Sequence, residues 1–276
     1  ASLFAAYPFT PTRRVEASLG FTRYSFDEEV LRQVYVNGFP TGVQEEDLDS
    51  RSALNLFQGS LAMVGDNSFF GFTSPIQGQR FRLEVEPTVG TLQFTSFLVD
   101  FRRYFMLRPF TLAARGLHLG RYGPDAEDDR LTPLFIGYAT FVRGYSSGSF
   151  DPARECQDRF GNDCAEFDRL LGSRIAVANL ELRFPFIGTS QWGLINFPYL
   201  PTELSAFVDA GAAWDKNSEV DLRFDTDTTA RVPVFSSGVS ARVNLLGALV
   251  LETYWAYPFQ RPNKGGHFGL QIAPGW

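Results

Sequence analysis

The residues with the most distinctive chemistry lie in one polar stretch, residues 153–168, which reads "ARECQDRFGNDCAEFD". The chain's two cysteines, Cys156 and Cys164, stand eight residues apart in it. A pair this close in a polar loop predicts one local disulfide, of the kind that persists in oxidising compartments outside the cytoplasm. Metal binding by the two thiols is the alternative, but no histidine lies nearby to complete a ligand set.

Carboxylates crowd the same region, and oxygen ligands at such density could hold Ca²⁺. Their spacing does not match the calcium loop of an EF-hand. We therefore prefer a solvated acidic loop and expect no metal site there. The acids concerned are Asp151, Glu155, Asp158, Asp163, Glu166 and Asp168.

Catalytic motifs are missing from the sequence. The two histidines, His118 and His267, are far apart, and neither has a metal-ligand partner two to four residues away. The serine-containing stretches "FSSGVS" and "YSSGSF" do not form a G-x-S-x-G elbow, and we find no phosphate-binding or dinucleotide-binding fingerprint. The sequence predicts no catalytic site and no cofactor, so we do not expect an enzyme.

Charge and composition narrow the class of protein further. The 276 residues carry a formal charge of -6 with both signs interspersed, which argues against nucleic acid as a partner. Aromatic residues make up 15% of the chain, about double the share in an ordinary soluble domain, yet mean hydropathy is only -0.11. No apolar run is long enough for a transmembrane helix. A closed transmembrane sheet fits, because there every second residue faces water.

The elements that must position these residues show a period of two, which is typical of β-strands. In "QRFRLEVEPTV", Phe81, Leu83 and Val85 share one face, while Arg82 and Glu84 share the other. Several such segments run for about 10 to 16 residues, enough to cross a bilayer at a tilt. We predict about eleven strands, at residues 1–9, 13–27, 52–66, 78–90, 92–107, 110–123, 172–187, 204–215, 232–245, 248–259 and 266–274.

The predicted connectors alternate between short and long. Long polar ones are expected at residues 28–51, 124–171 and 216–231, an asymmetry that is typical of outer-membrane barrels. The stretches 67–77 and 188–203 break this rule, because they would be long connectors at the end of the barrel that carries the short turns. A soluble sandwich alternates in the same way, but strand length, charged faces and aromatic content favour an all-β, antiparallel transmembrane β-barrel.

The C-terminal segment "HFGLQIAPGW" alternates and ends on an aromatic residue. Such an ending is similar to the C-terminal strand of bacterial outer-membrane proteins, although any edge strand can finish on tryptophan. We expect Phe268, Leu270, Ile272 and Trp276 to form this terminal strand signal.

Four ordered motifs carry a family resemblance that covers residues 52–276. "FVRGY", with Arg143, resembles the motif in the long inward-folding loop of the BamA/TamA-type outer-membrane assembly superfamily, also called the bacterial surface antigen family. "VANLELRFP" resembles the family's next strand, whose inward acid falls on Glu181. "FVDAGAAWD" resembles the strand after it, with Asp209 and Gly211 in its pattern. "FGFTSPIQGQRFRLEVEP" with "VDFRRYF" looks like barrel segments common in fused family members.

The resemblance implies that residues 124–171 fold back into a water-filled lumen. There Arg143 would bond Glu181 and Asp209 on the barrel wall, and Gly144 would allow close backbone approach. A solvated arginine in an ordinary loop is the alternative. The expected loop-lock residues are Val142, Arg143, Gly144 and Tyr145, with Glu181, Asp209 and Gly211 as their lumen partners.

The resemblance also implies a fold and a function. The family barrel has sixteen strands, so about eleven or twelve suggest a chain incomplete at its N-terminus; a self-closing barrel of about twelve strands is the alternative. We expect residues 1–276 to form one β-barrel domain in a bacterial or organelle outer membrane. The implied activity is insertion of β-barrel proteins or polypeptide transport, with the lipid bilayer, unfolded outer-membrane proteins and periplasmic domains or accessory proteins as partners. A membrane anchor for another domain and a passive pore are the alternatives.

Overall fold

The computed structural model describes residues 1–25, 29–36, 39–47, 52–156, 164–226, 228, 230–261 and 263–272. Its main sheet has thirteen strands, and eleven of them form one continuous antiparallel path. The short strands β6 (Phe69–Phe70) and β13 (Ile195–Asn196) pair outside that path. In pairing order the eleven are β1 (Ser2–Thr10), β2 (Arg13–Tyr24), β5 (Leu54–Asp66), β7 (Pro75–Gly90), β8 (Phe94–Leu107), β9 (Phe110–Tyr122), β12 (Arg174–Gly188), β14 (Thr202–Trp214), β15 (Val234–Leu245), β16 (Leu249–Pro258) and β17 (His267–Ile272).

The sheet buries its charged face and exposes its apolar face. On β12, Glu181 and Arg183 are fully buried, whereas Leu180 and Leu182 are 47% and 44% exposed. A soluble sandwich would do the opposite, because its core must be apolar. An apolar exterior that extends over so many strands is favourable only when it is surrounded by lipid. The fold is therefore that of a transmembrane β-barrel; we call the charged side the inner face and the apolar side the outer face.

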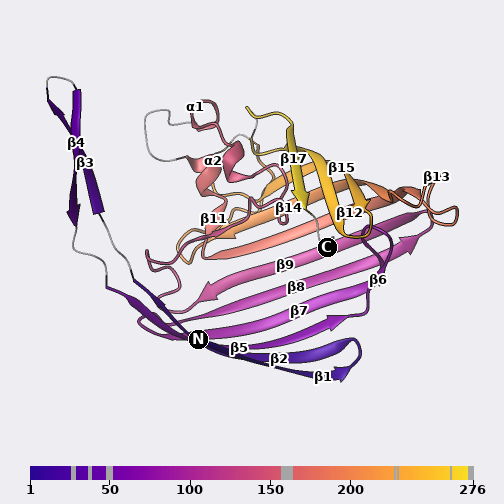
Figure 1. The fold of residues 1–276 in the computed structure, drawn as a ribbon, viewed down its shortest axis with the longest axis horizontal. Coiled ribbons are helices and arrows are strands. Elements are labelled where there is room, and N and C mark those ends of the chain that lie inside the picture. Colours follow the sequence, from indigo (N-terminus) through magenta and orange to yellow (C-terminus); the bar gives the residue numbers. More distant parts are fainter. Residues whose placement is uncertain are drawn as a thin grey trace.

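The strands curve around the inner face without closing on themselves. Figure 1 shows the sheet bending from β1 and β2 to β15 and β17. β1 and β17 are the two edges of the path, and every residue of β1 is exposed. Each of the eleven predicted segments holds one strand of this path, fewer than the sixteen that the family resemblance implies.

One predicted loop instead holds a hairpin. Within residues 28–51, β3 (Glu29–Val36) pairs with β4 (Phe39–Asp47) in a separate two-stranded sheet. Figure 1 shows this hairpin standing away from the main sheet. The side chains described on it are mostly exposed on both faces, so neither face selects apolar residues and no alternation marks it.

The two ends of the sheet differ in their connectors. At the short-turn end lie the turns at 11–12, 108–109 and 246–248, together with the longer connectors 67–74 and 189–201. The opposite, long-loop end carries residues 123–173, which we call the long loop. It contains β10 (Leu134–Phe135), η1 (Ser147–Ser149), α1 (Pro152–Glu155), α2 (Ala165–Asp168) and β11 (Leu171–Gly172).

The largest apolar core lies between the long loop and the inner face. Buried side chains of the loop pack there against β9, β12, β14 and β15. The loop is therefore part of the folded interior and not an appendage, which places its tip beside the charged residues of the strands. The core residues are Ile136, Val142, Tyr145 and Leu170 of the loop with Leu117, Ile175, Val177, Ala213 and Val234 of the strands.

Candidate functional site

A tight turn in the long loop aims Arg143 at the inner face. The backbone nitrogens of Phe141 and Val142 both bond the Tyr138 carbonyl, at 2.8 and 3.0 Å. Gly144 follows with a φ of +90°, and a Cβ there would lie 3.3 Å from a carbon of the Pro258 side chain. Glycine alone tolerates this backbone conformation without strain and also leaves room for β16. The turn thus depends on glycine directly after the arginine.

Arg143 bonds carboxylates from three strands. Its Nε and Nη2 each donate to one oxygen of Asp209 on β14, both at 2.8 Å. Its Nη1 lies 2.8 Å from Glu181 on β12 and 3.2 Å from Glu252 on β16. The guanidinium carbon also lies 3.4 Å from the centre of the Phe207 ring. The planar fork of arginine suits such a two-point carboxylate contact, which fixes direction as well as distance.

Two further arginines share these acids. Arg242 on β15 lies 2.9 Å from Glu181, 3.1 Å from Glu252 and 3.4 Å from Glu203. Arg183 donates to Glu181 at 2.8 Å. Charges buried this deeply are stable only when they are paired, so the seven side chains form one mutually dependent unit. We call it the inner charge cluster: Arg143, Arg183, Arg242, Glu181, Glu203, Asp209 and Glu252.

Strand side chains also hold the backbone of the turn. The Asn179 amide nitrogen donates to the Phe141 carbonyl at 2.7 Å and to Asp209 at 2.8 Å. From β9, Arg115 donates to the Thr140 carbonyl at 2.8 Å. The turn is thus fixed by its carbonyls as well as by its guanidinium, which limits how far it can move while the strands stay in place.

Gly211 contributes to the site by having no side chain, which leaves space for the loop beside β14. A Cβ on Gly211 would lie 2.7 Å from Val142 Cγ2 and 3.3 Å from Ile136 Cδ1. These distances are shorter than carbon atoms normally approach, so any larger residue would push the loop away from β14. Gly211 therefore allows Val142 to reach the wall.

Tyr145 ties the loop to the last hairpin of the sheet. It is fully buried, and its hydroxyl lies 2.9 Å from the Phe235 carbonyl and 3.1 Å from Gln260 Oε1. The same hydroxyl accepts a bond from the Gln260 backbone nitrogen at 3.1 Å. Burial raises the pKa of the Tyr145 hydroxyl above its ordinary value, so it stays protonated and able to donate.

Arg261, in the connector that precedes β17, forms a second charged anchor. It is 1% exposed, and its Nε and Nη2 donate to the two oxygens of Glu155 at 2.7 and 2.9 Å. Its Nη1 donates to the Gly144 carbonyl at 2.6 Å and to Ser149 Oγ at 2.8 Å. The guanidinium lies 3.7 Å from the Phe150 ring centre. The loop therefore holds the connector of the edge strand as well as the wall.

Several residues that make these contacts, among them Glu252, Gln260 and Arg261, were not predicted as site residues from the sequence. Glu252 falls on the polar face of a predicted strand, so alternation places it on the inner face but cannot show which arginine it meets. Gln260 and Arg261 lie in a turn that has no periodic pattern. Gln271 on β17 also donates to Glu252, at 2.9 Å, so the inner charge cluster reaches the edge strand.

The remaining predicted residues lie elsewhere. Cys156 and Cys164 are joined by a disulfide with an S–S distance of 2.07 Å, between α1 and α2. Asp158 and Asp163 lie outside the described residues. Among those described, no group of three or more histidine, cysteine, aspartate or glutamate side chains is arranged to hold a metal ion. Phe268, Leu270 and Ile272 are exposed on the outer face of β17, and Trp276 lies outside the described residues.

The family of the chain follows from comparison with known proteins. In the part that the structure describes, no helix has the length and apolar character needed to span a membrane. A search of curated proteins finds no match. The model of the Omp85 superfamily domain matches residues 1–275, nearly the whole chain. With an inner charged face, an apolar outer face and a long loop packed inside, the chain belongs to the Omp85 superfamily, whose members are outer-membrane assembly and transport barrels.

Proposed function

We propose that residues 1–276 act as one outer-membrane barrel domain, in a bacterium or an organelle, that inserts β-barrel proteins or carries polypeptides across the membrane. The observation that carries this proposal is the double attachment of the long loop. Arg143 bonds three strands, and Arg261 bonds the same loop to the connector of the edge strand β17. A loop that is bound both to the strands of the wall and to the connector before β17 can control how firmly the edge strand is held.

The edge strand is suited to exchange its partner. β17 has six residues and pairs with β16 alone along the path. Its other side offers backbone groups to an incoming strand, which is how peptides add to exposed sheet edges. Gly269 lies within it, and glycine weakens a strand. In this proposal the loop keeps β17 in register while an unfolded barrel protein pairs with its free side.

The partners follow from the same proposal. The apolar outer face requires a lipid bilayer, and the edge requires an unfolded outer-membrane protein as substrate. Periplasmic domains or accessory proteins would deliver that substrate. In this proposal the chain's role is mechanical and non-enzymatic, as for other members of the Omp85 superfamily. A passive pore fits less well, since the loop packs across the inner face.

The test is an insertion assay with the full-length protein reconstituted in liposomes. An unfolded bacterial β-barrel protein is added, and its folding is followed by heat-modifiable gel mobility. We expect faster folding than in empty liposomes, and slower folding with Arg143→Ala. Arg130→Ala is the matched control, because Arg130 lies in the same loop but bonds its neighbour Asp128, at 2.8 Å. Folding at the rate of empty liposomes would refute insertion and favour the membrane anchor.

A further inference from the structure

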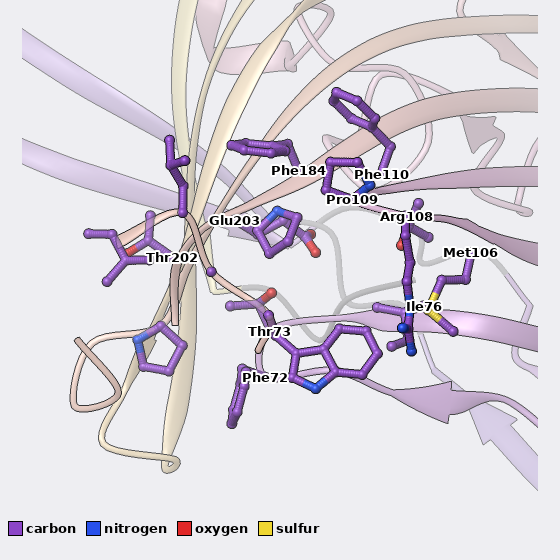
Figure 2. Close-up of a pocket in the computed structure, with 18 of the residues that line it drawn as sticks. Phe72, Thr73, Ile76, Met106, Arg108, Pro109, Phe110, Phe184, Thr202 and Glu203 are labelled. Carbon is purple, nitrogen blue, oxygen red and sulfur yellow. The ribbon is translucent and has the colours of Figure 1, made fainter. Parts of the chain in front are cut away.

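A cavity lies at the short-turn end of the sheet, far along the strands from the long loop. Its volume is about 630 Å³, within the range of about 300–1,000 Å³ that is common for small-molecule sites. The ends of β8, β9, β12 and β14 line it together with the connectors 67–74 and 189–201. Figure 2 shows Phe110 and Phe184 together on one side, Met106 and Arg108 on another, and Thr202 opposite.

The connector 67–74 forms one wall by folding inward across the strand ends. Ser74 Oγ lies 2.9 Å from both carboxylate oxygens of Glu203, and Asn244 Nδ2 donates to the Phe72 carbonyl at 2.5 Å. This explains why a long connector lies at the short-turn end. Glu203 also pairs with Arg242, at 3.4 Å, and the rest of the lining is mostly apolar.

Arg108 stands at the mouth of this cavity. It is exposed, and its guanidinium carbon lies 5.0 Å from the Trp192 ring centre. Among the described residues, no carboxylate forms an ion pair with Arg108. Arg103, on β8, is an arginine that does have a hydrogen-bond partner, because it donates to the Gln79 side chain at 2.7 Å. The cavity thus pairs an apolar interior with a cation that has no anionic partner in the described structure.

The position of the cavity connects it to the bilayer. Phe105, Leu107 and Phe110, next to its mouth, are 41–55% exposed on the outer side. Where the apolar band of a barrel ends, lipid headgroups begin. We propose that the cavity binds a phospholipid, whose acyl chain enters the apolar interior and whose phosphate bonds Arg108. Arginine matches phosphate geometry through two parallel N–H bonds.

A phospholipid fits the cavity better than an extended peptide does. An acyl chain needs no hydrogen bonds, whereas a peptide would bring backbone N–H and C=O groups into an apolar lining that leaves them unpaired. The edge strand β17 offers such groups a partner, but the cavity does not. This inference depends on the barrel lying in a membrane and not on the insertion activity proposed above.

The experiment is native mass spectrometry of the protein after delipidation in detergent and titration with phosphatidylglycerol. We expect one saturable lipid per chain and about tenfold weaker binding with Arg108→Ala. Ile76, at the start of β7, also lines the cavity, and Ile76→Trp should abolish binding by filling it. Arg103→Ala removes a nearby positive charge outside the cavity and should bind as wild type does. Heat-modifiable gel mobility verifies that each variant is folded.

Three outcomes would overturn the proposal. One is wild-type lipid binding by folded Arg108→Ala, which would mean that Arg108 does not hold the phosphate. Another is the absence of a saturable lipid on the wild-type protein, and the third concerns competition by the headgroup alone. Glycerol phosphate alone should not compete at equal concentration, because the acyl chain supplies the apolar contact; effective competition would assign a phosphate site in place of a lipid site.

Discussion

Arg143 and Asp209 meet through two parallel hydrogen bonds of 2.8 Å, and the Arg143 backbone nitrogen adds a third bond of 3.2 Å to the same carboxylate. One strand residue therefore receives both the side chain and the backbone of the loop. Glu181 and Glu252 each meet the same arginine through Nη1. Asp209 is for this reason the acid on which the position of the loop depends most.

Arg143→Ala and Asp209→Ala should each destabilise the folded barrel, and the two effects should not add. Removing one partner of a buried pair leaves the other charge unpaired, which costs about 3 to 5 kcal/mol, and less where water reaches the site. The double variant removes both charges, so its cost should fall short of the sum. Urea unfolding in lipid vesicles measures each free energy of unfolding.

The control for that cycle is Arg130→Ala, which breaks a local ion pair near the loop surface. Its free energy of unfolding should fall less than that of Arg143→Ala, because the Arg130 and Asp128 side chains keep 19% of their surface in water, whereas those of Arg143 and Asp209 keep 2% and none. Strictly additive effects of Arg143→Ala and Asp209→Ala would show that the two residues do not interact in the membrane.

Gly211→Ala should lower thermal stability by forcing its new Cβ to 2.7 Å from Val142 Cγ2. Overpacking of this kind costs about 1 to 3 kcal/mol. Adding Val142→Ala should restore most of the loss, because it removes the colliding atom. Gly116→Ala is the matched control, since a Cβ there meets nothing within 4 Å. The temperature at which the compact gel band disappears measures all four proteins; a failure of Val142→Ala to rescue would contradict this packing.

The sequence predicts the strands well because lipid and lumen impose opposite demands on alternate residues. β7 shows this: Phe81 and Leu83 face outward while Arg82 and Glu84 face inward, as the period of two requires. The hairpin of β3 and β4 could not be predicted in this way, because it stands free of the main sheet. Nor does alternation indicate closure, which depends on pairing between the first and last strands.

Only part of the candidate site could be predicted from the sequence. The family resemblance names Arg143, Glu181 and Asp209, and the structure brings them together. Glu252 is two strands beyond Asp209 in the pairing order, so its contact depends on the register of β15 and β16, which no local pattern encodes. Arg261 could not be found, because a buried arginine in a turn looks like any exposed one.

Acid should weaken the second anchor. Burial would raise the pKa of the Glu155 carboxyl, but its bonds from Arg261 lower it below the ordinary value of about 4.5. A lowered folded pKa means that this stabilisation is complete above about pH 4.5 and is lost as pH falls through the folded value. Glu155→Gln should remove that dependence.

The pH dependence can be followed by the midpoint temperature of heat-modifiable mobility between pH 7 and pH 3. The wild-type midpoint should fall more steeply with acid than that of Glu155→Gln. Other carboxylates contribute to both proteins, so the difference between the two curves is the quantity that tests the anchor. Parallel curves would contradict a role for this pair in stability.

The most direct test of the account is cleavage of the long loop by proteinase K in proteoliposomes, with the fragments identified by mass spectrometry. If Arg143 holds the loop on the inner face, its described parts, residues 123–156 and 164–173, should resist cleavage in the wild type and in Arg130→Ala, and should be cut rapidly in Arg143→Ala. Equal protection of the loop in Arg143→Ala and the wild type would show that the inner charge cluster does not hold it.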